Sequence, residues 1–292
     1  MSAILPSRRA ALGGIVGGLL AAALPTRQAA EAATVPAGRL KQSACRWPYR
    51  AIELPELCRR LKRMGFSGID LLHVDEWQQA NDAGLTVSMG YPSRREKFIE
   101  TGFNNPANHS LLLNELEAAL PLAGRAGVAN MIAMFGNRDP ARDDRAAIDS
   151  CVAGLAKIAP LAEEAGVTIC VELLNSRVDH AGYQGDHTAF GVAVMQGVNS
   201  PRVKLLYDIY HMQIMEGDVI RTIRNNIQWI GHFHTGGVPG RHEIDAGQEL
   251  NYRAVAQAIA DLGYKGYLAH EFIPTRPDPY ASLAEAFRIC SV

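Results

Sequence analysis

Two segments, Val167-Thr-Ile-Cys-Val-Glu-Leu173 and Val203-Lys-Leu-Leu-Tyr-Asp-Ile209, decide the fold of this chain. Each is a short apolar run with one acidic residue near its C-terminal end. Such runs are typical of strands buried on both faces. The stretch between them, Thr188–Val198, has helical character. A strand, a helix and a second strand in this order form a βαβ unit, which places both strands parallel in one sheet.

The same alternation extends in both directions and gives eight strand-then-helix units, several of whose helices stop at a glycine. The predicted strands are Leu40–Arg46, Gly68–Leu72, Leu85–Met89, Asn130–Phe135, Val167–Leu173, Val203–Ile209, Ile230–His234 and Tyr267–Phe272. The predicted helices are Leu54–Met64, Glu76–Ala83, Leu111–Ala126, Asp143–Ala165, Thr188–Val198, Val219–Asn226, Tyr252–Leu262 and Tyr280–Ile289. This pattern predicts an α/β fold, a single-domain (β/α)8 TIM barrel over residues 33–292. The alternative, a doubly wound open sheet, normally carries a glycine-rich phosphate loop, and the sequence contains neither G-x-G-x-x-G nor a P-loop.

The N-terminal residues 1–32 have the pattern of a cleavable signal peptide. A twin arginine, Arg8-Arg9, precedes an apolar stretch at residues 13–24, and Ala30-Glu31-Ala32 fits a small-x-small cleavage site. The apolar stretch is shorter than the roughly 20 residues that span a bilayer. We therefore expect export by the twin-arginine route to the periplasm or the exterior, without stable membrane insertion. A Sec signal or a retained anchor is the alternative.

Composition and charge exclude several classes of protein. The 292 residues are 48% hydrophobic and 20% charged, which is globular composition. A net charge of −1 and 7% aromatic residues argue against nucleic acid as a partner, because such proteins usually show a basic face. The five cysteines form no C-x-x-C pair, which argues against a structural zinc site, and we expect most of them to be buried thiols.

Four polar residues close the last four predicted strands: Glu172, Asp208, His234 and Glu271. They lie 36, 26 and 37 residues apart, close to one βα unit each time. Barrel enzymes place their working residues at the carboxyl ends of strands, so these four side chains are expected to converge. Three carboxylates and one imidazole would repel one another without a cation, and this ligand set suits Mn²⁺, Mg²⁺ or Co²⁺.

Two further residues follow the same strands. His211 lies three residues after Asp208, and Arg241 lies seven residues after His234. On loops above the metal, they are candidates to hold a carboxylate or hydroxyl of a small substrate. The alternatives are a structural histidine paired with Asp208 and an ordinary surface arginine.

With these motifs the sequence resembles the hydroxypyruvate isomerase family, within the xylose-isomerase-like barrel superfamily, over roughly residues 40–290. The most specific segments are residues 204–218, Ile230-Gly-His232 and Val238-Pro-Gly-Arg-His-Glu243. The resemblance implies that the residues matching Glu172, Asp208, His234 and Glu271 hold a divalent metal. It also implies that those matching Glu172 and Glu271 shuttle protons, and that those matching His211 and Arg241 contact substrate.

The chemistry implied is isomerisation of a small 2-hydroxy carbonyl compound through an enediolate, for example hydroxypyruvate to tartronate semialdehyde, or of a related ketose. An exported 3-keto-sugar lyase or hydratase, or a ketose epimerase, is the alternative on this scaffold. The predicted export signal favours it, and so does His234, where hydroxypyruvate isomerases typically have Gln. A third interpretation is a non-catalytic sugar-binding protein. The burial of three carboxylates argues against it, because burying charge is costly. The expected partner is the substrate alone, and a homo-oligomer is left open.

Overall fold

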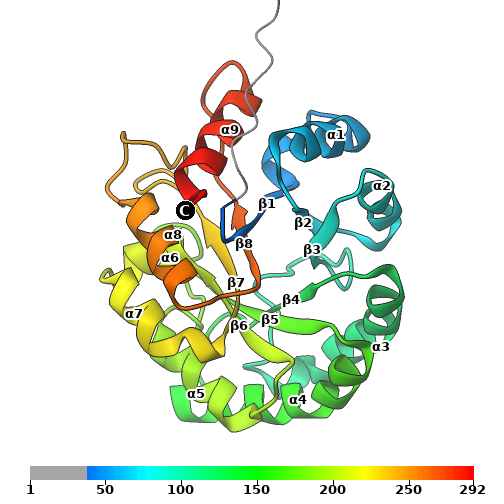
Figure 1. Ribbon diagram of the computed structural model, residues 1–292. Helices are drawn as coiled ribbons and strands as arrows, with labels where there is room; N and C mark the ends of the chain where they lie inside the picture. The colour runs from blue at the N-terminus through cyan, green and yellow to red at the C-terminus, as the bar shows by residue number, and fades with distance from the viewer. Residues whose placement is uncertain (1–37) are drawn as a thin grey trace, which may run out of the picture. The chain divides into compact units, whose positions relative to one another are not determined.

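Each strand of the chain pairs in parallel with the next, and the first strand also pairs with the last, so that the sheet closes into a barrel. The computed structural model describes residues 38–292 (Figure 1). The strands are β1 (Lys41–Cys45), β2 (Gly68–Leu72), β3 (Thr86–Gly90), β4 (Asn130–Met134), β5 (Thr168–Leu173), β6 (Val203–Asp208), β7 (Ile230–Thr235) and β8 (Tyr267–His270).

The helices surround the barrel, as Figure 1 shows for α3, α4 and α5 along one side. Helix α1 buries Leu54, Leu57 and Leu61, whose spacing places them on one face, and ends where Gly65 adopts φ 99°. The α-helices are α1 (Leu54–Met64), α2 (Trp77–Asp82), α3 (His109–Ala126), α4 (Asp144–Ala165), α5 (Thr188–Val198), α6 (Ile209–Met215), α7 (Val219–Asn226), α8 (Tyr252–Asp261) and α9 (Pro279–Cys290). The 3₁₀ helices are η1 (Trp47–Tyr49), η2 (Val74–Glu76), η3 (Pro106–Asn108) and η4 (Ile227–Trp229).

The predicted barrel is confirmed, and every predicted strand and helix overlaps an observed one. Helix α6 and the four 3₁₀ helices were not predicted. The predicted signal peptide falls within residues 1–37, which lie outside the described part of the chain. From residue 38 onwards, no helix has the length and apolar character needed to cross a membrane. The cysteines Cys45, Cys58, Cys151, Cys170 and Cys290 are all buried and free, as expected.

The hydrophobic core occupies the barrel and the layer between the strands and the helices. Strands β2, β4, β5 and β8 are buried at every position, because both faces of a parallel sheet are covered. Several ionisable side chains are nevertheless buried on or directly after the strands of the barrel. They are Asp70, Glu172, Asp208, His232, His234 and, directly after β8, Glu271. Lone charges of this kind are rarely buried, so their grouping marks a site.

Candidate metal centre and active site

The four predicted metal ligands come together inside the mouth of the barrel. Glu172, Asp208, His234 and Glu271 each offer one ligand atom, and these atoms all lie within 4.8 Å of one another. The register explains the convergence, because Asp208 pairs with His234 across β6 and β7, and His234 pairs with Ala269 near the end of β8. All four side chains are buried, with at most 5% of each residue exposed.

Asp208 has a second structural role, which fixes its orientation. Its Oδ1 atom accepts hydrogen bonds from the backbone N–H groups of Tyr210 (2.8 Å) and His211 (3.4 Å), so that Asp208 caps helix α6. The other oxygen, Oδ2, lies 3.4 Å from Arg241 Nη2 and 3.5 Å from His211 Nε2. One oxygen of Asp208 therefore stabilises the start of α6, and the other faces the candidate site.

The surroundings of the two glutamates shift their pKa values in opposite directions. Burial raises the pKa of Glu172. Burial would also raise the pKa of Glu271, but Arg241 and His234 beside it hold that pKa well below its usual range. Both oxygens of Glu271 accept hydrogen bonds, one from Trp47 Nε1 (2.6 Å) and one from Arg241 Nη2 (2.6 Å). Pairs of carboxyl groups whose pKa values are pushed apart in this way are typical of acid–base sites.

His234 is oriented by a carboxylate from the opposite side of the barrel. Its Nε2 atom forms a 2.8 Å hydrogen bond with Asp70 Oδ2, and the other carboxylate oxygen, Oδ1, accepts from Ser88 Oγ (2.5 Å). His232, one layer deeper, lies 3.2 Å from Asp70 Oδ1 through its Nε2 atom. With Nε2 committed to Asp70, the Nδ1 atom of His234 faces the other three ligands. A carboxylate in this position is the usual support of a metal-binding histidine.

An irregularity in β2 gives Asp70 its direction. The register between β2 and β3 shifts on both sides of Asp70, and Leu71 has a left-handed backbone with φ 60°. Strand residues normally alternate between faces, yet Asp70 reaches the histidines inside the barrel and Leu71 lines the cavity. A bulge re-aims side chains in this manner and is common beside functional sites.

The residues present fit a divalent cation. His234 Nδ1 lies 2.8 Å from Glu271 Oε2 and 3.3 Å from Glu172 Oε1, but it has no well-oriented hydrogen bond to any described residue. Burial would lower the pKa of His234, but the Glu271 carboxylate raises it, so without an ion an imidazolium offsets the negative charge. An ion bound by Nδ1 and the three carboxylates would replace that proton.

This exchange predicts that the ion binds more weakly at low pH. Burial raises the pKa of Asp208 to about 7, although Arg241 opposes the shift. Below pH 7 the Asp208 carboxyl is protonated, and the ion has to displace that proton. We expect the Mn²⁺ affinity to fall at least tenfold between pH 7 and pH 6, because both the His234 imidazolium and the Asp208 carboxyl have to release a proton. Titration calorimetry at pH 6 and pH 8, in buffers of different ionisation enthalpy, would measure affinity and protons released. Equal affinity at both pH values would contradict the expectation.

His211 lies on α6, beside the metal ligands, and is fully buried. Its Nδ1 atom accepts a hydrogen bond from the backbone N–H of Asn175 (3.1 Å), so its proton resides on Nε2. Burial and the Arg241 charge lower its pKa well below the usual range, which makes the ring neutral. Nε2 has no hydrogen-bond partner in residues 38–292. A neutral imidazole with a free N–H beside Asp208 is suited to donate to a substrate oxygen.

Arg241 is not a surface residue. Its guanidinium lies 5.3 Å from the ring centres of Trp47 and Tyr210, and it pairs with Glu271 and, more distantly, Asp208. The loop places it there through a left-handed backbone, with φ 59° at Arg241 and φ 92° at Gly240. Its charge is thus largely committed to the acidic ligands, and its buried Nε atom lacks a hydrogen-bond partner among the described residues.

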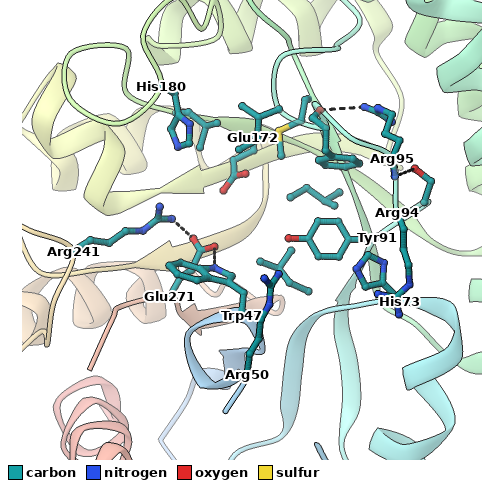
Figure 2. A pocket seen from close by; sticks show the side chains of 17 residues that line it. Trp47, Arg50, His73, Tyr91, Arg94, Arg95, Glu172, His180, Arg241 and Glu271 are labelled. Carbon is teal, nitrogen blue, oxygen red and sulfur yellow. Dashed lines mark hydrogen bonds and ion pairs between the residues drawn. The ribbon is translucent and has the colours of Figure 1, made fainter. Parts of the chain in front are cut away.

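A cavity of about 390 Å³ opens beside these residues (Figure 2). Glu172, Glu271 and Arg241 line one end of it. The remaining wall is aromatic, aliphatic and basic, formed by Trp47, Arg50, Leu71, His73, Tyr91, Ser93, Arg94, Arg95, Phe98, Ile99, Ile132, Met134, Leu174 and His180. The volume lies within the roughly 300–1,000 Å³ of small-molecule sites.

Three residues of this site were not predicted from the sequence: Asp70, Trp47 and Tyr91. An acidic residue inside the apolar run Gly68–Leu72 was a usable signal for Asp70, because a buried carboxylate needs a partner. Trp47 and Tyr91 follow β1 and β3 directly, where barrel enzymes carry their functional loops.

Comparisons with known proteins agree with the barrel fold. The family model of the xylose isomerase-like TIM barrel matches residues 43–290. A 2-oxo-tetronate isomerase from Cupriavidus necator is 38% identical over 157 residues, which cover 53% of this chain and 59% of the relative. A human protein named as a hydroxypyruvate isomerase is 29% identical over 239 residues, which cover 76% of this chain and 86% of the relative.

Among solved structures, a family 2 AP endonuclease from Brucella melitensis superposes with a TM-score of 0.73 at 25% identity. The superposition covers 84% of this chain and 98% of that one. The likeness extends over the whole barrel rather than over a few strands.

Proposed function

Because the chain belongs to the xylose isomerase-like TIM barrel family, we propose that it is a metal-dependent isomerase of a small hydroxy-carbonyl compound. The observation that carries the proposal is the meeting of Glu172, Asp208, His234 and Glu271 within 4.8 Å, at one end of a small-molecule cavity. Relatives named as isomerases support it. Oxygen-rich ligation with one nitrogen favours Mn²⁺, Mg²⁺ or Co²⁺.

We assign proton transfer to Glu172. Its carboxylate faces the cavity and its pKa is raised by burial, whereas both oxygens of Glu271 are already engaged by Trp47 and Arg241. The bound ion would polarise the carbonyl and so acidify the neighbouring C–H group. Glu172 then removes that proton and returns it to the former carbonyl carbon, while the hydroxyl proton moves between the two oxygens. One C–H bond breaks and one forms, so no redox partner is needed.

His211 and Arg241 complete the site in this proposal. The Nε2–H of His211 donates to a substrate oxygen, where it stabilises negative charge that develops during proton transfer. Arg241 holds Glu271 in place and presents its unpartnered Nε–H near the substrate. Glu271 acts as a fixed anionic ligand. It would serve as the second proton-transfer group only for a substrate inverted at one carbon, where one of its two engaged oxygens would have to be released.

The activities for which the relatives are named make hydroxypyruvate and 2-oxo-tetronate the first substrates to test. The cavity volume favours a second candidate class, ketoses and keto-glycosides, because 390 Å³ is generous for a three-carbon molecule. Epimerisation or elimination on such a sugar would begin with the same proton removal by Glu172.

A substrate panel tests the proposal. Purified protein is treated with a chelator, reloaded with Mn²⁺, Mg²⁺ or Co²⁺, and assayed against hydroxypyruvate, 2-oxo-tetronate, ketoses and keto-glycosides. We expect turnover in the reloaded protein alone, with partial incorporation of deuterium from D₂O at the carbon that receives the proton, because a proton held on Glu172 can exchange with solvent before it is returned. Turnover that survives complete metal removal would refute metal dependence, and no turnover on the panel would refute the proposed substrate class.

A further inference from the structure

The two ends of the cavity carry opposite charge and come from opposite halves of the barrel. Glu172 on β5, Asp208 on β6 and Glu271 directly after β8 supply the carboxylates of the candidate metal centre. The loops after β1, β2 and β3 supply Arg50, His73 and Arg94, which we call the basic wall. Figure 2 shows Glu172 and Glu271 facing the space from one side, and the basic wall on the other side of Tyr91 and Trp47. An elongated molecule in this cavity would touch both ends.

The remaining cations of the cavity are already neutralised. Arg241 is paired with Glu271 and Asp208. Arg95 is mostly covered, with 12% of its side chain exposed, and is paired with Glu115. Neither has a charge to spare for a substrate anion, so a carboxylate or phosphate on the substrate has to be matched elsewhere.

Arg50 carries a positive charge that is available to a substrate anion. It is exposed, it lines the cavity, and across residues 38–292 no carboxylate forms an ion pair with it. Arg94 is paired with Asp75 at 2.7 Å, but both side chains are more than half exposed, and surface pairs of this kind are weak. Arg50 is therefore the cation of the basic wall that is most available to a ligand.

The placement of Arg50 follows from the short helix η1. In a 3₁₀ helix residues i and i+3 share one face, and Trp47 and Arg50 are so related at its two ends. Trp47 is tied to Glu271 by the 2.6 Å hydrogen bond and lies against Arg241. Arg50 thus lies over the cavity rather than away from it, and Figure 2 shows its side chain extending from beside Trp47 toward Tyr91.

The electrostatic field at His73 agrees with this placement. His73 stacks on Tyr91 with ring centres 4.7 Å apart. Burial lowers the pKa of His73, and the charges of Arg94 and Arg50 lower it further. His73 is therefore neutral at pH 7, and the positive charge of the basic wall belongs to the arginines.

We propose that Arg50 binds an anionic end group of the substrate, a carboxylate or a phosphate, while the reacting carbons lie at Glu172. The substrate class is then a sugar acid or sugar phosphate long enough to reach from Arg50 to Glu172, rather than a neutral ketose of the same length. The position of the reacting carbons rests on the proposed function. The preference for an anion rests on the basic wall alone.

Binding measurements test this without requiring turnover. The probes are D-erythronate, D-erythritol 4-phosphate and neutral erythritol, titrated by calorimetry into wild type, R50A, R50Q and R50K. The control is R145A, on the outer face of α4, where the Arg145 side chain is 82% exposed. Each titration is run with Mn²⁺ and with chelator, because an α-hydroxy acid also binds cations directly.

We expect wild type and R145A to bind at least one of the two anionic probes more tightly than erythritol. R50A and R50Q should lose about tenfold in affinity for that probe, R50K should keep part of it, and erythritol should bind all variants alike. The anionic probe that binds more tightly shows whether the site prefers a carboxylate or a phosphate. For a turned-over acid, R50A should raise KM and leave kcat within about twofold.

Unchanged affinity of R50A and R50Q for both anionic probes would overturn the proposal, and so would equal binding of erythritol by wild type. These outcomes are distinguishable from failure of the proposed function. A protein that isomerises nothing but loses anion binding in R50A keeps the basic wall as a binding site. A protein that isomerises ketoses equally well in wild type and R50A keeps the function and loses the Arg50 proposal.

Discussion

Replacing Glu172 by Gln is expected to lower kcat about 10³-fold, because the amide cannot accept the proton that the reaction removes. The same change takes one anionic ligand from the metal, so the metal content should fall below one ion per chain. Steady-state kinetics and elemental analysis of the purified variant would measure the two effects. Adding excess Mn²⁺ separates them, since it restores occupancy but not the proton acceptor.

Glu164→Gln provides the matched control. Glu164 is exposed on α4, and the substitution removes the same charge without touching the barrel mouth. It should leave kcat and metal content as in wild type. Full metal occupancy in both Glu172→Gln and Asp208→Asn would show that the metal assignment is wrong, whereas wild-type kcat in Glu172→Gln would transfer the proton acceptor to another group.

Removing Asp70 is expected to have the largest effect on stability of any change at this site. Asp70→Ala would leave His232 and His234 buried without their shared carboxylate, and breaking a buried ionic contact in this way costs about 3–5 kcal/mol. Asp70→Asn keeps the shape but not the charge, and it should weaken metal binding about 10- to 100-fold, as for other residues that orient metal-binding histidines. Urea denaturation and Mn²⁺ titration would measure these losses.

The pH dependence of that stability difference has a definite sign. Burial would raise the pKa of Asp70, but His232 and His234 hold it well below its usual range. The stabilisation is therefore complete above the pKa of an unfolded aspartate, about 3.9, and is lost as the pH falls below it. The gap between wild type and Asp70→Asn should be full at pH 7 and shrink below pH 4. Asp149→Asn, on the exposed face of α4, should show no gap at either pH.

The barrel could be predicted because each unit has a local pattern, an apolar strand followed by a helix, and several of the helices end at a glycine. Helix α6 was missed because it follows β6 with no loop. Asp208 is at once the last residue of that strand and the N-cap of the helix, so the apolar run continues into Ile209 without a break. Short helices of this kind depend on tertiary contacts and leave a weak pattern.

From the sequence, only the site residues at the ends of regular strands could be predicted. The four candidate metal ligands follow from one rule about strand ends. Asp70 does not, because a bulge at Leu71 directs it inward and its partners lie on β7, more than 150 residues away. For Arg241, the sequence predicted a loop above the metal but not the pairing with Glu271, which depends on the left-handed turn at Gly240 and Arg241.

The division of the barrel mouth into an acidic half and a basic half has an evolutionary consequence. Ligands on β5 to β8 are built into the sheet, whereas Arg50, His73 and Arg94 stand on loops that can change without disturbing the strands. Related barrels can therefore diverge in what they accept while the acidic half of the mouth stays constant. Grafting residues 46–53 from a relative would be a direct way to exchange that preference. Trp47 lies within this segment and would have to be retained, because its hydrogen bond to Glu271 connects the variable half to the constant one.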